Sequence, residues 1–462
     1  MKPFAVLFAL ALSAGAVTAR AEVQVPQTTS QITLSFAPVV KAAAPAVVNV
    51  FAKSIVRQSA SPFAGDPFFG PLFRDYAQTQ PRVQNSLGSG VILSPDGLVV
   101  TNYHVIAGAN EIRVALKDRR EFPAKVVLAD KAVDLAVLKL DGAHGLTALK
   151  LRDSNSVQVG DLVLAIGDPF GVGQTVSSGI VSGLSRSLLS LNNGKGYYMQ
   201  TDAPINPGNS GGALVDMTGR LVGINSAILS RSGGSNGIGF AIPSNLVRAF
   251  LAQAEAGAKH FVRPWAGMTE QAVDASLAEN LGMAAPDGVL VAAMAGESPF
   301  ARAGVARGDV ILSIDGQPVN SPQELSYRMT AAGLHRSVPV TYLHKGERRT
   351  ADVALMPPPD RPAREELTIS GNVVFRGLTV ENVNPAVIAE LSLPADAKGV
   401  VVADAEDFAA QVGLQRGDIL ISVNGHPIHS PADVRRASRE QTHYWRVEVI
   451  RGGNRLRLRF SI

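Results

Sequence analysis

The chain has 462 residues, more than one hydrophobic core usually serves, so we expect several domains. Hydrophobic residues make up 46% and charged residues 18%, which is typical of a folded globular protein and excludes a disordered one. The absence of cysteine excludes disulfides, zinc–thiolate sites and cysteine nucleophiles.

Residues 1–21 have the pattern of a secretory signal peptide. Lys2 precedes an apolar stretch too short to span a bilayer comfortably, and an A-x-A sequence ends at Ala21. An uncleaved anchor is the alternative. Cleavage would remove Lys2 and Arg20, leaving 41 of the 43 basic residues against 39 acidic ones. This balance and the lack of a basic run give no support to nucleic-acid binding, and we expect a soluble, exported chain with no transmembrane segment.

Residues 36–258 contain short, β-branched apolar segments separated by glycine turns. The sequence SPDG at 94–97 predicts a hairpin turn between two alternating segments. Only SNLVRAFLAQAEAG, at 244–257, reads as a clear helix, so the pattern predicts an all-β barrel or sandwich. The insertion at 57–86 breaks the strand rhythm and carries several phenylalanines, which favours an interaction role.

The C-terminal part contains an internal repeat. Residues 304–325 align without gaps to residues 413–434, and both copies share R-G-D, a Gly-x-Pro turn and a Ser-Pro that opens a helix. Between them lies MPPPDRP at 356–362, whose composition is that of a stiff linker. The sequence therefore predicts a β domain followed by two copies of one smaller module.

Three stretches of the β domain carry candidate chemistry. His104 follows an apolar strand, Asp134 begins an alternating one, and Ser210 lies in PINPGNSGGALV at 204–215. Taken singly, His104 is more typical of a structural histidine, Asp134 of a strand-end cap and Ser210 of a turn residue. A serine hydroxyl needs a neutral imidazole to take its proton and a carboxylate to orient that imidazole. The chain order His, Asp, Ser on a β scaffold is that of chymotrypsin-like enzymes, so we predict Ser210 as nucleophile.

The glycines around Ser210 suggest a shaped backbone. Converging N–H groups of Gly208 and Ser210, with Asn209 between them, would stabilise an oxyanion, and a glycine allows the required turn. We expect Gly211 and Gly212 to leave room for substrate beside the hydroxyl. No metal-ligand motif is present, GDPFGVGQ at 167–174 reads as a structural turn rather than a phosphate cradle, and no cofactor is expected.

Together, TNYHVI, VDLAVLKL, GDPFG, QTDAPINPGNSGGALV and GIGFAIPSN resemble the HtrA family of exported serine proteases, in its DegP- or DegQ-like subgroup with two PDZ domains. The resemblance covers nearly the whole mature chain. It implies a mainly β fold, with a chymotrypsin-like double β-barrel followed by two PDZ domains. It also implies an ATP-independent endopeptidase of the bacterial periplasm that degrades misfolded or unfolded proteins, with possible chaperone activity in stress response and protein quality control.

The resemblance implies further roles, position by position. His104 is the general base, Asp134 its orienting partner and Ser210 the nucleophile. The segment SAILS matches the strand that pairs with substrate and borders the specificity pocket, which with Ile205 should favour small or medium aliphatic side chains; its residues are Ser226, Ala227, Ile228, Leu229 and Ser230. Arg186 matches a regulatory arginine, and residues 57–86 match the regulatory loop.

The repeated modules resemble PDZ domains, which add a peptide strand to a sheet edge and hold its terminal carboxylate in backbone N–H groups. In the first module, Trp265, Ala266, Gly267 and Met268, followed by Thr269, fit the carboxylate loop. In the second, FRGL at 375–378 places Arg376 where a hydrophobic residue is expected. We therefore expect hydrophobic C-terminal peptides on the first module, while the second is mainly an assembly element.

The predicted domains are a signal peptide at 1–21, the protease at 22–258, the first PDZ domain at 259–356, a linker at 357–367 and the second PDZ domain at 368–462. The resemblance implies homotrimers formed through residues near Phe36, or multiples of trimers. Two alternatives remain, a holdase with a vestigial protease and a PDZ scaffold for C-terminal tails. The intact candidate triad argues against the first.

Overall fold

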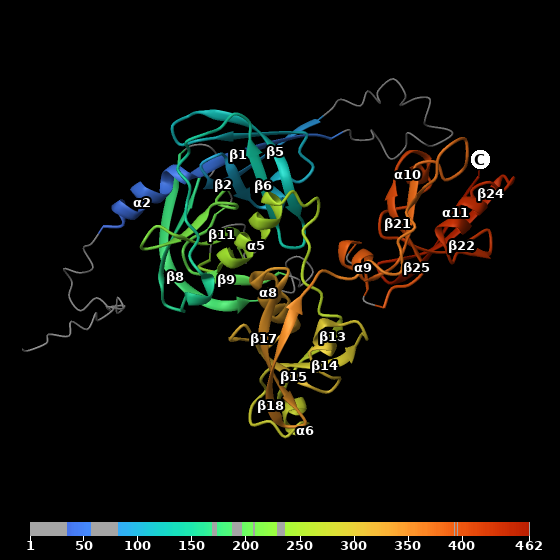
Figure 1. Ribbon diagram of the computed structural model, residues 1–462. Coiled ribbons are helices and arrows are strands. Elements are labelled where there is room, and N and C mark those ends of the chain that lie inside the picture. Colours follow the sequence, from blue (N-terminus) through green and yellow to red (C-terminus); the bar gives the residue numbers. More distant parts are fainter. Residues whose placement is uncertain are drawn as a thin grey trace, which may run out of the picture. The chain divides into compact units, whose positions relative to one another are not determined.

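The computed structural model describes residues 35–56, 82–168, 173–186, 196–206, 208–228, 236–391, 393–394 and 396–461 (Figure 1). The predicted signal peptide at 1–21 and most of the insertion at 57–86 lie outside these residues. The end of that insertion is strand rather than loop, because β2 begins at Arg82. In the described part of the chain, no helix has the length and apolar character needed to cross a membrane.

Six strands close the first barrel, in the order β1-β2-β3-β6-β5-β4. They are β1 (Val47–Val56), β2 (Arg82–Ser94), β3 (Leu98–Thr101), β4 (Glu111–Ala115), β5 (Glu121–Asp130) and β6 (Leu135–Leu140). The hairpin expected at SPDG joins β2 to β3, and Gly97 supplies its positive φ of 84°. Alternating apolar residues of these strands fill the barrel interior, as Val91, Val99 and Val137 do with no exposed surface.

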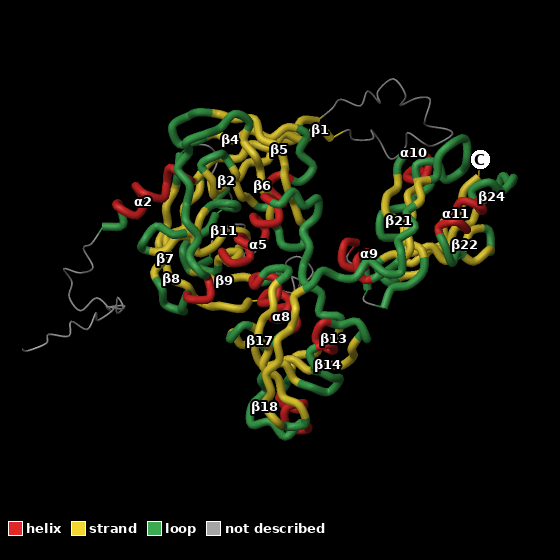
Figure 2. The backbone as a smooth tube through the Cα atoms, in the orientation of Figure 1, coloured by secondary structure: helices red, strands yellow, loops and turns green. Residues whose placement is uncertain are grey.

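A second closed barrel follows, in the order β10-β11-β12-β9-β8-β7. Its strands are β7 (Leu162–Gly167), β8 (Thr175–Arg186), β9 (Tyr198–Thr201), β10 (Ala213–Asp216), β11 (Leu221–Ile228) and β12 (Gly239–Pro243). Strands therefore dominate this part of the chain, and Figure 2 shows them in yellow. The two barrels confirm the mainly β, chymotrypsin-like fold class expected from the sequence.

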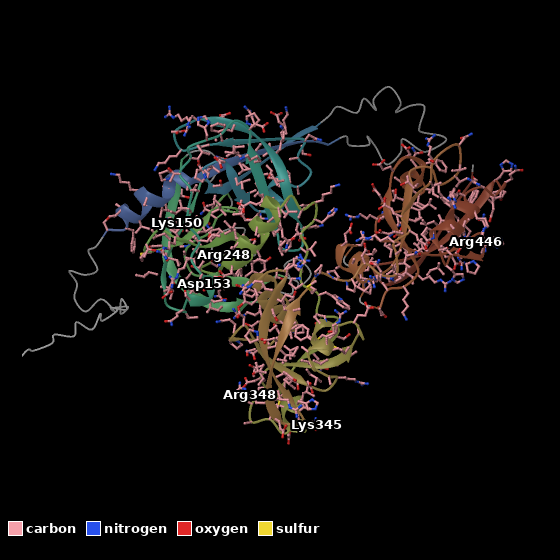
Figure 3. The ribbon with its side chains drawn as sticks, in the orientation of Figure 1. Lys150, Asp153, Arg248, Lys345, Arg348 and Arg446 are labelled. Carbon is pink, nitrogen blue, oxygen red and sulfur yellow. The ribbon has the colours of Figure 1, made fainter. Side chains whose placement is uncertain are left out.

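Short helical elements flank the barrels. They are α2 (Ala37–Ala43), η1 (Ala44–Ala46), α4 (Tyr103–Ile106), η2 (Ser154–Ser156) and the expected helix α5 (Ser244–Glu255). At the start of α5, Asn245 donates to Asp153 Oδ1 at 2.7 Å and accepts from Arg248 at 2.9 Å, and Figure 3 labels both charged partners. The Asn245 N–H donates to Ser154 Oγ at 3.2 Å, which supplies an acceptor at a helix start where Pro243 offers no side-chain cap.

The first PDZ module is a sheet in the order β13-β14-β15-β17-β18, with β16 paired to β15. Its elements are β13 (Met268–Ala272), α6 (Ala275–Asn280), β14 (Val289–Met294), α7 (Pro299–Arg302), β15 (Val310–Ile314), β16 (Gln317–Pro318), α8 (Pro322–Ala332), β17 (Arg336–His344) and β18 (Glu347–Leu355). The β17–β18 hairpin bears Lys345 and Arg348 near its turn (Figure 3). Strand β13 stands at the edge of the sheet, and its outer side is not paired with any described strand.

The second PDZ module repeats this plan with one addition, in the order β19-β20-β21-β22-β24-β25 with β23 paired to β22. Its elements are β19 (Leu367–Thr368), β20 (Leu378–Asn382), α9 (Pro385–Leu391), β21 (Val400–Ala405), α10 (Asp407–Gln411), β22 (Ile419–Val423), β23 (His426–Pro427), α11 (Pro431–Ala437), β24 (Tyr444–Arg451) and β25 (Asn454–Ser461). The extra strand β19 covers the edge of β20 that corresponds to the open edge of β13.

The aspartates of the repeated R-G-D sequence have a structural role. Asp309 accepts from Ala306 N and Asp418 accepts from Gln415 N, both at 2.9 Å, so each carboxylate closes the same turn. Both are nearly inaccessible, at 3% and 0% exposed. Their partners differ, because Asp309 meets His344 through one hydrogen bond while Asp418 receives two from the guanidinium of Arg451. The Asp418 hydrogen bonds raise the pKa of Arg451.

Candidate active site

His104 and Asp134 meet in the first barrel. His104 lies on the short helix α4, directly after β3, and Asp134 directly precedes β6 with a positive φ of 55°. Asp134 is 7% exposed, and both of its carboxylate oxygens lie 2.9 Å from His104 Nδ1. A carboxylate only accepts, so these bonds require a proton on Nδ1 and leave Nε2 free of one in the neutral ring.

Three further hydrogen bonds to Asp134 hold this pair in place. The backbone N–H of His104 donates to Asp134 Oδ1 at 3.1 Å, and the Asn102 side chain donates to the Asp134 carbonyl at 2.9 Å. Ser226 Oγ donates to Asp134 Oδ2 at 2.8 Å. The carboxylate therefore has several donors although it is almost fully buried, which offsets the cost of taking its charge out of water.

Ser210 lies between β9 and β10 in the second barrel, and Ser226 of β11 connects it to the pair. The Ser210 hydroxyl donates to the Ser226 carbonyl at 3.1 Å, while the Ser226 hydroxyl bonds Asp134. Among the described residues, the only hydrogen bond of the Ser210 hydroxyl is this one, and none joins it to His104. The structure thus brings the three predicted residues to one place, with the hydroxyl turned toward Ser226.

The loop that leads to Ser210 carries two backbone N–H groups without an acceptor in the described structure. Gly208 has φ of 98°, a conformation that side-chain-bearing residues rarely adopt, and its carbonyl accepts from Ser89 Oγ at 2.6 Å. Asn209 donates its N–H to Asn206 O at 2.9 Å. Within the described chain, the N–H groups of Gly208 and Ser210 have no acceptor, so both are available to an incoming oxyanion.

Gly211 and Gly212 differ from expectation, because they serve packing rather than substrate access. A Cβ on Gly211 would collide with the Ser89 carbonyl and the Thr101 hydroxyl, and one on Gly212 would collide with the Ile166 carbonyl. The Ser89 N–H also donates to the Ser210 carbonyl at 2.8 Å. The glycines thus allow this loop of the second barrel to lie directly against β2 of the first.

Sequence reasoning missed Ser89 and the hydroxyl of Ser226. Ser89 bonds Gly208 and also accepts from Asp168 N at 2.8 Å, so one hydroxyl joins β2, the end of β7 and the candidate oxyanion loop. Ser226 was expected to pair with substrate through its strand, not to support Asp134. Both are contacts between residues far apart in sequence, and no local motif marks them.

Of the other residues expected around the site, the structure describes some and not others. Ser226, Ala227 and Ile228 end strand β11, and Leu229 and Ser230 lie outside the described residues. Ile205 is 1% exposed and packs against Gly239. Arg186 is the last residue of β8, where its backbone pairs with Tyr198. In the described part of the chain, no group of three or more His, Cys, Asp and Glu residues could hold a metal ion.

The carboxylate loop expected in the first PDZ module is a turn held from both sides. Gly267 has φ of 67°, its carbonyl accepts from Ala295 N at 2.8 Å, and the Ala266 carbonyl accepts from Ser298 Oγ at 2.6 Å. Trp265 N donates to Met356 O at 2.8 Å, which joins the start of the module to its end. A groove begins at this loop, includes Thr269 of β13, and continues between β13 and α8; Pro385, Ile388 and Ala389 of α9 line it as well.

The corresponding edge in the second PDZ module is occupied by the chain itself. Strand β19 pairs antiparallel with β20, placing Thr368 opposite Thr379. Beyond it, Ile369 N donates to Leu378 O at 2.8 Å, and Gly377 N donates to Ile369 O at 3.0 Å. Ile369 is 3% exposed and packs in the module's core. The N–H of the FRGL loop therefore holds an internal carbonyl in the position that a peptide terminus would take.

Three family models match the chain, a trypsin-like peptidase domain at 88–224 and PDZ domains at 268–355 and 399–444. The chain is 36% identical over 483 residues to the periplasmic serine endoprotease DegP of Salmonella typhimurium, covering 99% of this chain and 98% of that one. It is 36% identical over 465 residues to the periplasmic pH-dependent serine endoprotease DegQ of Escherichia coli, covering 98% of both. The HtrA-type protease AlgW, solved with a decapeptide, is 41% identical, with a TM-score of 0.51 over 71% of this chain and all of that one.

The fold and these relatives together define a class, the serine endoproteases built from a trypsin-like double barrel and PDZ domains. Within that class, the chain belongs to the HtrA family, in its DegP/DegQ-like group with two PDZ domains.

Proposed function

We propose that the chain is an ATP-independent endopeptidase of the periplasm that cleaves misfolded or unfolded polypeptides with Ser210, His104 and Asp134. The observation that carries this proposal is the buried Asp134 carboxylate at 2.9 Å from His104 Nδ1, linked through Ser226 to the Ser210 hydroxyl. That arrangement fixes the imidazole tautomer needed to accept the serine proton. The periplasmic location rests on the names of its relatives and on the leader-like sequence at 1–21.

The proposed reaction starts with a rotation of the Ser210 side chain away from the Ser226 carbonyl and toward His104 Nε2. Attack on the scissile carbonyl then transfers the hydroxyl proton to His104, whose positive charge Asp134 stabilises. The N–H groups of Gly208 and Ser210 receive the oxyanion, a contribution of about 2.7–4 kcal/mol to the barrier for one such donor in other proteases. His104 returns the proton to the leaving amine, and water releases the acyl group by the same path.

The specificity pocket is proposed to lie near Ile205 and the end of β11. Ile205 is buried against Gly239, so a substrate side chain can reach it only if this wall moves. An apolar wall of this kind favours small or medium aliphatic residues. Arg186 and the insertion at 57–86 are proposed to regulate the site, and homotrimers are proposed to form near Phe36, whose side chain is 38% exposed.

The first PDZ module is proposed to bind hydrophobic C-terminal peptides. Three features support this: the turn at Gly267, the open edge of β13 and the groove along α8. AlgW, a relative solved with a peptide, is consistent with a peptide ligand here. Chaperone activity is proposed as a separate property, which a variant lacking the nucleophile can show.

Digestion of unfolded casein by the wild type and by Ser210→Ala tests the proposal. We expect the variant to lose activity by about 10⁴-fold or more, because no other group in the triad replaces the nucleophile. Ser94→Ala, in the β2–β3 turn, is the matched control and should retain activity. Equal digestion by wild type and Ser210→Ala would overturn the proposal. Light scattering on the same samples measures the assembly, and suppression of aggregation by Ser210→Ala measures chaperone activity.

A further inference from the structure

The groove of the first PDZ module contains one carboxylate, that of Glu270. Binding the apolar last residue of a peptide does not require it. Glu270 lies in β13 and lines the groove, and every other residue that lines it is uncharged. Met268, two residues earlier, lines the groove too and packs on the module's core. The β13–β14 register shifts between Thr269 and Glu270, but the extra residue, Ala292, lies on β14. The alternation along β13 therefore keeps Met268 and Glu270 on one face, the side where a peptide would lie.

The described structure gives Glu270 no cationic partner. Neighbouring β14 has no charged residue, and the one charged residue of α9, Glu390, pairs with Arg364 at 2.8 Å. The two charged residues of α8, Glu324 and Arg328, bond each other at 3.2 Å and do not line the groove. Burial among the uncharged residues that line the groove raises the pKa of Glu270 to about 7, and only a hydrogen bond from its own backbone N–H opposes that shift.

The geometry of strand addition places this carboxylate opposite one position of a peptide. A peptide whose carboxylate is held by the loop at 265–268 would add antiparallel to the open edge of β13, with its last side chain beside Met268. Cross-strand neighbours share a face, and the alternation has a period of two residues. The side chain two residues before the end therefore lies beside Glu270.

We propose that Glu270 makes the groove of the first PDZ module select peptide C-termini with a lysine or arginine two residues before an apolar last residue. The proposal rests on the proposed function, since it requires that this groove binds C-terminal peptides. A cationic side chain at that position forms a charge-assisted hydrogen bond with a carboxylate that otherwise lies unpaired in an apolar groove. An acidic side chain there meets like charge, and an apolar one leaves the carboxylate desolvated without a partner.

The test measures binding of fluorescent peptides to full-length Ser210→Ala protein, which does not consume them. Three peptides share an apolar last residue and differ only two residues before it, carrying Lys, Ala or Glu. At pH 8 we expect the Lys peptide to bind about tenfold more tightly than the Ala peptide, and the Glu peptide to bind most weakly. In Glu270→Gln the three affinities should converge. Glu279→Gln, the same change at an exposed position of α6, should keep the preference.

A pH series adds a second readout. Protonation neutralises Glu270 below pH 7, so the preference for Lys over Ala should shrink between pH 8 and pH 6 in the wild type and stay flat in Glu270→Gln. Equal binding of all three peptides, or a preference that survives Glu270→Gln, would overturn the inference while leaving peptide binding intact. Failure of every peptide to bind would overturn the proposed function of the module, and the inference with it.

Discussion

The two PDZ modules share a fold and a repeat but treat the same sheet edge in opposite ways. In the first, β13 ends the sheet and a groove runs beside it. In the second, β19 covers β20, and Ile369 fills the position next to the FRGL loop. The difference does not lie in the strands of the repeat, which align without gaps. It lies in the few residues that precede each loop.

The groove-facing residues differ as well. Aligning the two loops at Gly267 and Gly377 places Glu270 opposite Val380, which is fully buried and lies across from Leu367 of β19. An apolar residue suits a position permanently covered by the chain's own strand. A partly buried carboxylate without a cationic partner suits a groove that receives a ligand of opposite charge. The comparison thus supports the proposal that the first module binds peptide, while the edge of the second is closed by its own chain.

The largest expected effect concerns the stability of the closed module. Arg451→Met leaves the fully buried Asp418 carboxylate without its two guanidinium hydrogen bonds, so we expect a loss of about 3–5 kcal/mol in the free energy of unfolding. Trp265→Phe leaves Trp445 as the sole tryptophan, and its fluorescence during urea titration reports this module. The control is Arg446→Met, an exposed arginine on the same strand (Figure 3), which should cost little. A small loss in Arg451→Met would show that the pair does not hold this module together.

The next effect concerns the covering strand itself. Ile369→Ala removes most of a side chain that is 3% exposed, so we expect a loss of about 3 kcal/mol in the second module. Loosening β19 also frees the edge of β20, so a photo-crosslinking hydrophobic peptide should label the second module in the variant and only the first in the wild type. Mass spectrometry locates the label. Leu456→Ala, at a side chain that is 36% exposed, is the control. Labelling of the second module in the wild type would contradict the closed state.

The sequence predicts the fold of the two PDZ modules, but it does not predict most of the difference between their sheet edges. Alternating apolar segments and glycine turns predict the barrels, and the gapless repeat predicts two modules, because both signals are local. Arg376 in the second loop predicted an altered site, a prediction with which the covering strand β19 agrees. It could not show the physical cause, since β19 is only two residues long and its pairing with β20 depends on tertiary packing.

In the candidate active site, too, some residues could be predicted from local sequence and others could not. His104, Asp134 and Ser210 each stand in a recognisable local sequence, and their order along the chain predicts their meeting. Ser89 and the Ser226 hydroxyl act through contacts across 119 and 92 residues, which no local pattern encodes. Gly211 was expected to make room for substrate, but the constraint on it comes from Ser89 and Thr101 of another barrel.

The smallest expected effect tests the carboxylate that separates the two grooves. The pKa of Glu270 is raised from its ordinary 4.5 to about 7, so the folded first module binds a proton more tightly than the unfolded chain does. The stability that this proton supplies is fully present below pH 4.5 and is lost as the pH rises through 7, a change of about 2–3 kcal/mol. Glu270→Val, which introduces the residue type found at position 380, removes it. Relative to the wild type, this variant should therefore become more stable as the pH rises from 4.5 to 8, measured by Trp265 fluorescence with Trp445→Phe in both proteins. Glu279→Gln should show no such trend, and a flat difference for Glu270→Val would mean that the open groove does not desolvate its carboxylate.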